Sequence, residues 1–114
     1  MKIDSYSFGV IKIDGQEFKS DLIIYPDHVD DKWWRKEAHL LQIEDLTGVL
    51  ALKPEILLVG QGQPGLMKVD QKVEEHCRKN SIRLLVMPTE KAVEEYNHSS
   101  GKKEKIIACF HLTC

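Results

Sequence analysis

The sequence has no excess of charge of either sign and no long apolar run. Its 114 residues include 16 lysines and arginines and 18 aspartates and glutamates, a formal charge of −2, so the chain has no general attraction to nucleic acid or to an anionic membrane. No stretch approaches the roughly 20 apolar residues of a membrane-spanning helix, and Met1–Asp4 lacks the continuous apolar core of a secretory signal. We therefore expect a cytoplasmic protein without membrane insertion and without a nucleic-acid partner.

Cysteine is also scarce. Cys77, Cys109 and Cys114 are an odd number without CxxC spacing, which favours reduced thiols over a disulfide framework. The last residues offer a metal site built from Cys109, His111 and Cys114, or a Cys–His nucleophile. On a strand, however, residues 109 and 111 share a face that residue 114 does not, and no second pair completes four ligands. We expect no metal, no cofactor and no catalytic residue, and a buried, hydrogen-bonded His111 is the simpler interpretation.

Glycine motifs for nucleotide binding are absent, although a glycine-rich loop is present. Four apolar residues, Ile56–Val59, predict a strand buried on both faces. Gly60, Gly62 and Gly65 follow it with neither dinucleotide nor P-loop spacing. The loop is either a tight structural turn or a ligand or partner contact, because open α/β sheets place ligands at the carboxyl ends of their strands.

The composition, 42% hydrophobic and 30% charged, is typical of one globular domain over residues 1–114. Alternation over Ser7–Ile13, followed by Asp14-Gly15, predicts an amino-terminal β-hairpin that returns through Phe18–Ile24. The strands before and after the helix capped by Asp70 should be parallel neighbours. The other expected elements are a helix over Ile43–Leu50, strands Ile56–Gly60 and Ile82–Met87, a helix capped by Thr89 and ended by Asn97, and a last strand Lys105–His111.

Two tryptophans stand beside an arginine in Trp33-Trp34-Arg35. The indoles either cover one end of the core, or form a recognition surface in which Arg35 is stacked or holds an anion. Arg35, His39, Thr89 and His111 all fall at the ends of expected elements, where they can converge above the sheet.

Several short motifs together resemble a known family. Trp34-Arg35 with His39-Leu40, Leu58–Gly62, Met87–Ala92 with Tyr96-Asn97, and His111–Cys114 occur in the order found in the small domain family that includes the adipogenesis-associated protein and the mitochondrial NADH dehydrogenase complex I assembly factor 3. This resemblance implies a three-layer α/β domain with a mixed sheet of about five strands, the last one antiparallel, beside the amino-terminal hairpin. It implies no reaction or cofactor, and it favours action through protein partners.

We interpret the chain as a binding or assembly module that contacts a protein partner or a small ligand at the glycine loop. The alternatives are an enzyme with a small-molecule pocket at the carboxyl ends of the parallel strands, and a purely structural partner subunit. A cavity enclosed by the site residues would favour the enzyme. The predicted site residues are Arg35, Gly60, Gln61, Gly62, Gln63, Thr89 and His111.

Overall fold

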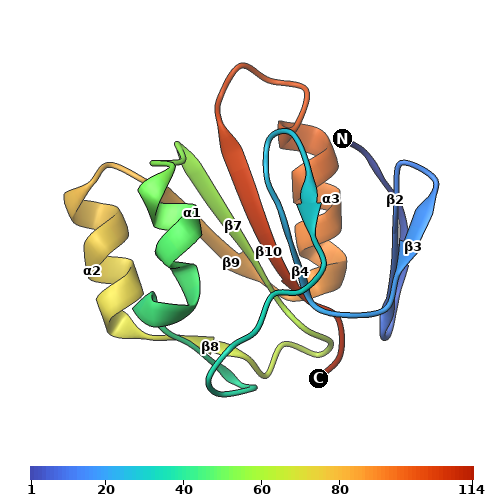
Figure 1. The fold of residues 1–114 in the computed structure, drawn as a ribbon, viewed down its shortest axis with the longest axis horizontal. Helices are drawn as coiled ribbons and strands as arrows, with labels where there is room; N and C mark the ends of the chain where they lie inside the picture. Colours follow the sequence, from blue (N-terminus) through green and yellow to red (C-terminus); the bar gives the residue numbers. More distant parts are fainter.

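A computed structural model describes all residues, 1–114, and shows a three-layer α/β domain (Figure 1). The middle layer is a five-stranded mixed sheet in the order β5-β4-β10-β7-β9. One outer layer contains α1 and α2, and the other contains α3 together with a three-stranded amino-terminal sheet, β1-β2-β3. The elements are β1 (Ile3–Ser7), β2 (Val10–Ile13), β3 (Gln16–Phe18), β4 (Leu22–Ile24), β5 (Val29–Asp30), β6 (Leu40–Leu41), the 3-10 helix η1 (Ile43–Leu46), α1 (Thr47–Ala51), β7 (Ile56–Gln61), β8 (Lys68–Val69), α2 (Gln71–Lys79), β9 (Arg83–Met87), α3 (Thr89–Ser99) and β10 (Ile106–His111).

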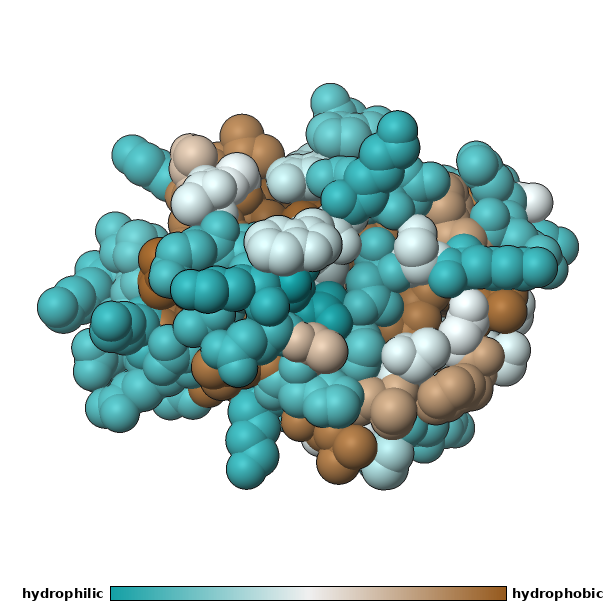
Figure 2. Space-filling model, turned by 60° about the horizontal axis from the view of Figure 1, so that its bottom comes forward, coloured by the Kyte–Doolittle hydropathy of each residue, from teal (hydrophilic) through white to brown (hydrophobic).

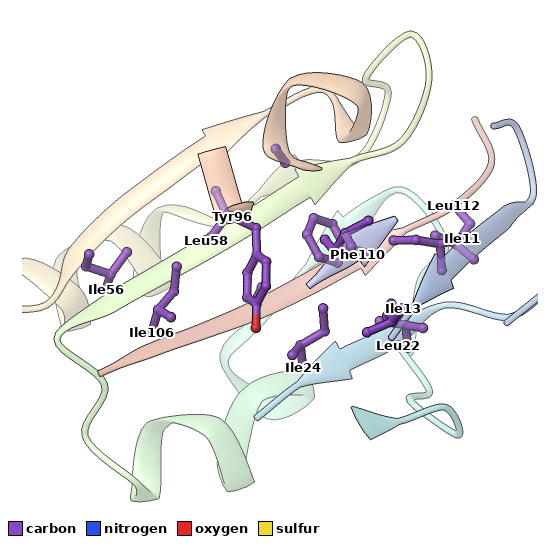
Figure 3. Close-up of a cluster of buried hydrophobic side chains, with 13 residues drawn as sticks. Ile11, Ile13, Leu22, Ile24, Ile56, Leu58, Tyr96, Ile106, Phe110 and Leu112 are labelled. Carbon is purple, nitrogen blue, oxygen red and sulfur yellow. The ribbon is translucent and has the colours of Figure 1, made fainter. Parts of the chain in front are cut away.

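The predicted central strand is confirmed, because β7 is buried along residues 56–60 and lies between β10 and β9. Its side chains alternate between two cores, as the period of a strand requires. Ile56 and Leu58 pack toward α3 and the amino-terminal sheet, in the cluster drawn in Figure 3. Leu57 and Val59 pack on the opposite face, toward α1 and α2. A run with no polar position is therefore what a strand covered on both faces needs.

The mixed sheet is confirmed, with one qualification about its last strand. β7 pairs in parallel with β9 and with β10. β10 has two neighbours, and it runs parallel to β7 and antiparallel to β4. The expectation of an antiparallel last strand thus holds toward β4 and is wrong toward β7. The reason is the helical connection through α3, which returns the chain to the sheet in the direction of β9.

The hairpin at Asp14-Gly15 is confirmed: both residues have positive φ, 47° and 83°, and β2 pairs with β3. The expected return strand over Phe18–Ile24 is wrong, because β3 ends at Phe18 in the amino-terminal sheet and β4 begins at Leu22 in the central sheet. The chain changes layer between them, and Asp21 lies in this crossing.

Two helix ends differ from the predictions. Asp70 caps α2 as expected, and its side chain accepts a hydrogen bond from the Lys72 amide. Thr89 is instead the first residue of α3, after Pro88. Its hydroxyl forms hydrogen bonds with the backbone of Gly62 and His111. Asn97 does not end α3 but lies within it, where its amide exchanges two hydrogen bonds, 2.9 and 2.8 Å long, with the backbone of Ile3. Long-range contacts thus replace the local capping that the sequence suggests.

The longest helix, α3, has 11 residues, and no helix in the structure has the length and apolar character that a bilayer span requires.

Candidate functional site

Five of the seven predicted site residues meet at the carboxyl ends of the parallel strands, namely Arg35, Gly60, Gly62, Thr89 and His111. Thr89 lies at the centre and is fully buried. Its hydroxyl donates to the His111 carbonyl oxygen at 2.6 Å and accepts from the Gly62 amide at 2.8 Å. The Thr89 amide in turn donates to the Gly62 carbonyl oxygen at 3.0 Å. One threonine therefore ties the end of β7 and the start of α3 to the end of β10.

The glycines permit this close approach. A Cβ at Gly60 would lie 2.6 Å from Phe110 Cδ1 and 3.0 Å from Thr89 Oγ1. Gly62 has φ +90°, and a Cβ there would overlap the Thr113 carbonyl oxygen and come within 2.6 Å of His111 Cδ2. Both positions thus exclude a side chain for steric reasons, and Gly62 also has a backbone conformation that L residues rarely adopt. The predicted structural role of the loop is sufficient to explain these two glycines.

A carboxylate that the sequence interpretation missed completes the cluster. Asp21 Oδ2 lies 2.8 Å from Arg35 Nη1 and 2.7 Å from His111 Nδ1, and Asp21 Oδ1 accepts from the Leu112 amide at 2.8 Å. The side chains of Arg35 and His111 are each only 6% exposed, and that of Asp21 is 21% exposed. We call Asp21, Arg35 and His111 the buried polar cluster.

The contacts assign the protons of this cluster. A carboxylate only accepts hydrogen bonds, so the Nδ1–H group of His111 donates to Asp21. Arg35 Nη2 lies 3.1 Å from His111 Nδ1, but that nitrogen carries the hydrogen and cannot accept. Arg35 Nη2 therefore donates to the Ala38 carbonyl oxygen at 3.1 Å. Burial raises the pKa of Asp21, but the hydrogen bonds from His111 and Leu112 and the charges of His111 and Arg35 outweigh it, so the pKa is lowered overall. Asp21 is therefore an anion that Arg35 neutralises.

The cluster has the Asp–His hydrogen bond of a general base, but a substrate cannot reach the histidine. An aspartate that orients His Nδ1–H leaves Nε2 to accept a proton from a substrate. Here Nε2 is buried without a hydrogen-bond partner, as is Arg35 Nε. None of the three surface pockets is lined by a residue of the cluster. The site residues converge, but they pack against one another rather than around a cavity.

Arg35 is held in a fixed position by its neighbours. Its guanidinium lies 4.8 Å from the centre of the Trp33 ring, and Trp33 Nε1 donates to the Asp45 carbonyl oxygen at 3.0 Å. The rings of His39 and His111 meet edge to face at 6.0 Å. Trp33 therefore packs on the core, as the first interpretation of the tryptophan pair states, and it also stacks on Arg35. Trp34 is 75% exposed, and a recognition surface there stays a prediction.

The two glutamines of the loop are less exposed than a contact residue should be. Gln61 is half-buried, and its Nε2 donates to the Met67 carbonyl oxygen at 3.0 Å, which closes the loop on itself. Gln63 is also half-buried, and its backbone N–H donates to the Thr113 carbonyl oxygen at 3.0 Å. Of the two glutamines only Gln63 lines a pocket, of about 310 Å³, and the other lining residues are Pro64, Pro88, Glu90, Lys91 and Glu94.

Metal chemistry finds no support in the arrangement of side chains. No group of three or more His, Cys, Asp or Glu residues is placed to hold an ion. Cys77 and Cys109 are buried, and Cys114 is exposed. Burial raises the pKa of the Cys109 thiol, and the nearby Arg35 only partly offsets this. A thiol in that environment remains protonated and unreactive.

Sequence reasoning missed Asp21 and did not single out Phe8 or Leu66, although it offered Trp34 as part of a recognition surface. Asp21 lies with Lys19 and Ser20 in a polar break between Phe18 and Leu22, a signal that the sequence did contain. Trp34, Phe8 and Leu66 are 75%, 59% and 51% exposed.

Comparison with known proteins places the chain in a family. The sequence pattern of the family described as Protein of unknown function (DUF498/DUF598) matches residues 3–111. The match spans nearly the whole chain, so the protein belongs to this family.

Solved structures share the fold along the full chain. A conserved hypothetical protein from Pyrococcus horikoshii OT3 is 30% identical over 100% of both chains, with a TM-score of 0.86. A protein from Xanthomonas campestris is 21% identical, covers 96% of this chain and 83% of its own, and has a TM-score of 0.82. A Mth938-like domain from Bordetella pertussis is 16% identical, covers 97% and 85%, and has a TM-score of 0.62. The last two similarities show the fold alone.

Proposed function

We propose that the chain is a binding module that contacts a protein partner through the exposed apolar residues at the carboxyl edge of its sheet. We call Phe8, Trp34, Pro64 and Leu66 the carboxyl-edge surface. The observation that carries the proposal is the exposure of Trp34, Phe8 and Leu66 around a polar cluster that lines no pocket. Exposed aromatic and large apolar side chains on a rigid part of the backbone are typical of surfaces that bind other proteins.

Each of these residues is adjacent in sequence to a contact at the end of β10 or in the glycine loop. Gly9, after Phe8, donates its amide to the Leu112 carbonyl oxygen at 2.8 Å. Arg35, after Trp34, reaches His111. Pro64 and Leu66 belong to the glycine loop, and a Cβ at Gly65 between them would lie 3.3 Å from Pro88. Figure 2 brings this side of the molecule forward and shows apolar side chains scattered among polar ones.

The enzyme alternative lacks a specific observation in its favour. An active site needs a concave space that a substrate can enter, and the buried polar cluster borders none. The pocket beside Gln63 has a lining that includes two glutamates and one lysine, without a serine, threonine, cysteine or histidine. The resemblance to a family whose members act through protein partners supports the same choice.

The test is capture of partners from the extract of the protein's own cells. We expect the double variant Trp34→Ala, Leu66→Ala to lower recovery of a specific protein about tenfold, the effect of losing about 1.4 kcal/mol of binding free energy. The matched control is Leu52→Ala, another exposed leucine that follows α1 and precedes β7 at the opposite edge. Both variants should melt within about 2 °C of the wild type, because exposed substitutions change stability by about 0.5 kcal/mol or less. Equal loss in both variants, or in neither, would contradict the proposal.

A further inference from the structure

A second surface lies between the outermost strands of the two sheets. A groove of about 320 Å³ runs there, and we call it the strand groove. It shares no residue with the carboxyl-edge surface, so its role is independent of the function proposed above. Its lining residues are Met1, Ile13, Asp14, Gln16, Phe18, Val29 and Asp31.

Two outermost strands contribute residues to the lining of the groove. β3 is the outermost strand of the amino-terminal sheet, and β5 is the outermost strand of the central sheet. In Figure 1, β5 is drawn in cyan and β3 in blue. An outermost strand presents backbone N–H and C=O groups with no strand to pair with, which makes it a template for another extended chain. Gln16 and Phe18 belong to β3 and Val29 to β5, so the groove lies along two such templates.

The floor of the groove is apolar and continuous with the core. Met1, Phe18 and Val29 are half-buried and pack against the buried cluster that contains Ile13. They leave one side open to the solvent along the groove. A large apolar side chain entering from outside would bury this surface, which is the anchoring contact that extended-peptide sites use.

The rim of the groove is acidic. Asp14 and Asp31 line it and are exposed, and neither carboxylate forms an ion pair with a lysine or an arginine. The Asp14 carboxylate accepts only a backbone hydrogen bond, from the Lys2 amide at 2.9 Å. The charge at the rim is therefore available to a cation from a partner.

We propose that the strand groove binds an extended, basic peptide segment of a partner protein, which adds as a strand to one of its two edges. In an extended chain, residues i−2, i and i+2 point to the same side. The segment therefore places one large apolar residue on the groove floor and a lysine or arginine two positions before or after it, toward Asp14 or Asp31. Backbone hydrogen bonds supply affinity, and the apolar and basic side chains supply specificity.

The probe is a fluorescein-labelled nonapeptide with the core Lys-Thr-Leu-Thr-Lys in a Thr/Val background, titrated by fluorescence anisotropy. We expect saturable binding, weakened about tenfold when both lysines become glutamates. N-methylation of the core residues, which removes backbone donors without changing the side chains, should abolish the binding. Absence of saturation up to about 1 mM, or equal binding of the N-methylated peptide, would overturn the proposal.

Protein variants separate the groove from general electrostatics. Asp31→Lys should weaken the lysine peptide at least about fivefold. Asp27→Lys, at an exposed aspartate that precedes β5 and does not line the groove, should change it less than about twofold. Equal effects of the two variants would reduce the binding to nonspecific charge attraction. A homodimer held through these edges, seen by sedimentation and not displaced by the peptide, would assign the groove to a second copy of the chain and overturn the proposal.

Discussion

Replacement of Asp21 by asparagine tests whether the buried polar cluster stabilises the domain. The asparagine side chain would keep the size of the aspartate and one carbonyl oxygen, so the Leu112 amide can keep its acceptor. It would remove the negative charge beside Arg35, whose side chain is 6% exposed. It would also place an NH₂ group near the N–H groups of Arg35 and His111, where only an acceptor fits. The variant therefore changes the charge and the hydrogen bonding of the side chain while keeping its shape.

The expected loss is about 3 kcal/mol of unfolding free energy. Removal of one partner of a buried ion pair costs about 3–5 kcal/mol, because the remaining charge stays buried without compensation. The lower end of that range applies here, since the Asp21 side chain is 21% exposed and water can reach it. A loss of this size is a large part of the roughly 5–15 kcal/mol that stabilises a domain.

Denaturation by urea at several pH values measures this loss. The folded pKa of Asp21 is lowered, so its stabilisation is present above the ordinary aspartate pKa of about 3.9 and is lost as the pH falls through the lower folded value. The difference between wild type and variant should therefore be full at pH 7 and should narrow below about pH 4.

Asp27→Asn is the matched control. Asp27 Oδ1 lies 2.7 Å from His28 Nδ1, the same separation as in the cluster, but its side chain is 86% exposed. Its substitution should leave the free energy of unfolding unchanged within the error of the measurement, because solvent screens an exposed pair. A loss below about 1 kcal/mol for Asp21→Asn at pH 7, or equal losses in both variants, would refute the view that the cluster is a stabilising buried ion pair.

Three further predictions concern the backbone and the thiols. Gly62→Ala should lower the free energy of unfolding by about 2–4 kcal/mol, because its Cβ would meet Thr113 and His111 and the residue has positive φ. Gly101→Ala has open space around it and should change that free energy by less than about 1 kcal/mol, as thermal or chemical denaturation can measure. Ser81→Gly should raise the free energy of unfolding by about 0.5 kcal/mol, because Ser81 follows α2 with φ +57°, which glycine adopts without strain. Ser100→Gly should lower it, because Ser100 has φ −67°, and chemical denaturation should therefore give changes of opposite sign for the two variants. A thiol reagent should modify Cys114 in the native protein and Cys77 and Cys109 only after unfolding, because the last two are buried; rapid native labelling of Cys109, followed by mass spectrometry, would contradict this.

Local sequence patterns predicted the elements whose structure depends on neighbours in the chain. The run Ile56–Val59 identified β7 because a strand covered on both faces tolerates no polar residue. Asp14-Gly15 identified the β2–β3 turn because both residues accept positive φ. Asp70 identified the start of α2 because its side chain caps a nearby amide. In each case the deciding sequence pattern spans only a few residues.

The missed features depend on partners that are distant in sequence. Asp21 meets His111 and Leu112, which lie 90 and 91 positions further along the chain. Asn97 bonds to the Ile3 backbone across 94 positions. Local rules assigned Asn97 to a helix end and could not assign Asp21 to any role, because no pattern in a single sequence reports which distant groups a short polar side chain will meet.

The buried polar cluster and the carboxyl-edge surface are connected by the chain itself. Asp21 joins three segments at residues 21, 35 and 111–112, and Arg35 is further held by Trp33 and the Ala38 carbonyl oxygen. Trp34 lies between Trp33 and Arg35, so both of its neighbours are fixed while its own indole remains 75% exposed. A side chain on a fixed backbone loses less conformational entropy on binding than one on a free loop. If the cluster serves the partner contact in this way, Asp21→Asn should weaken partner capture even under conditions where the domain stays folded, although Asp21 itself is not part of the surface.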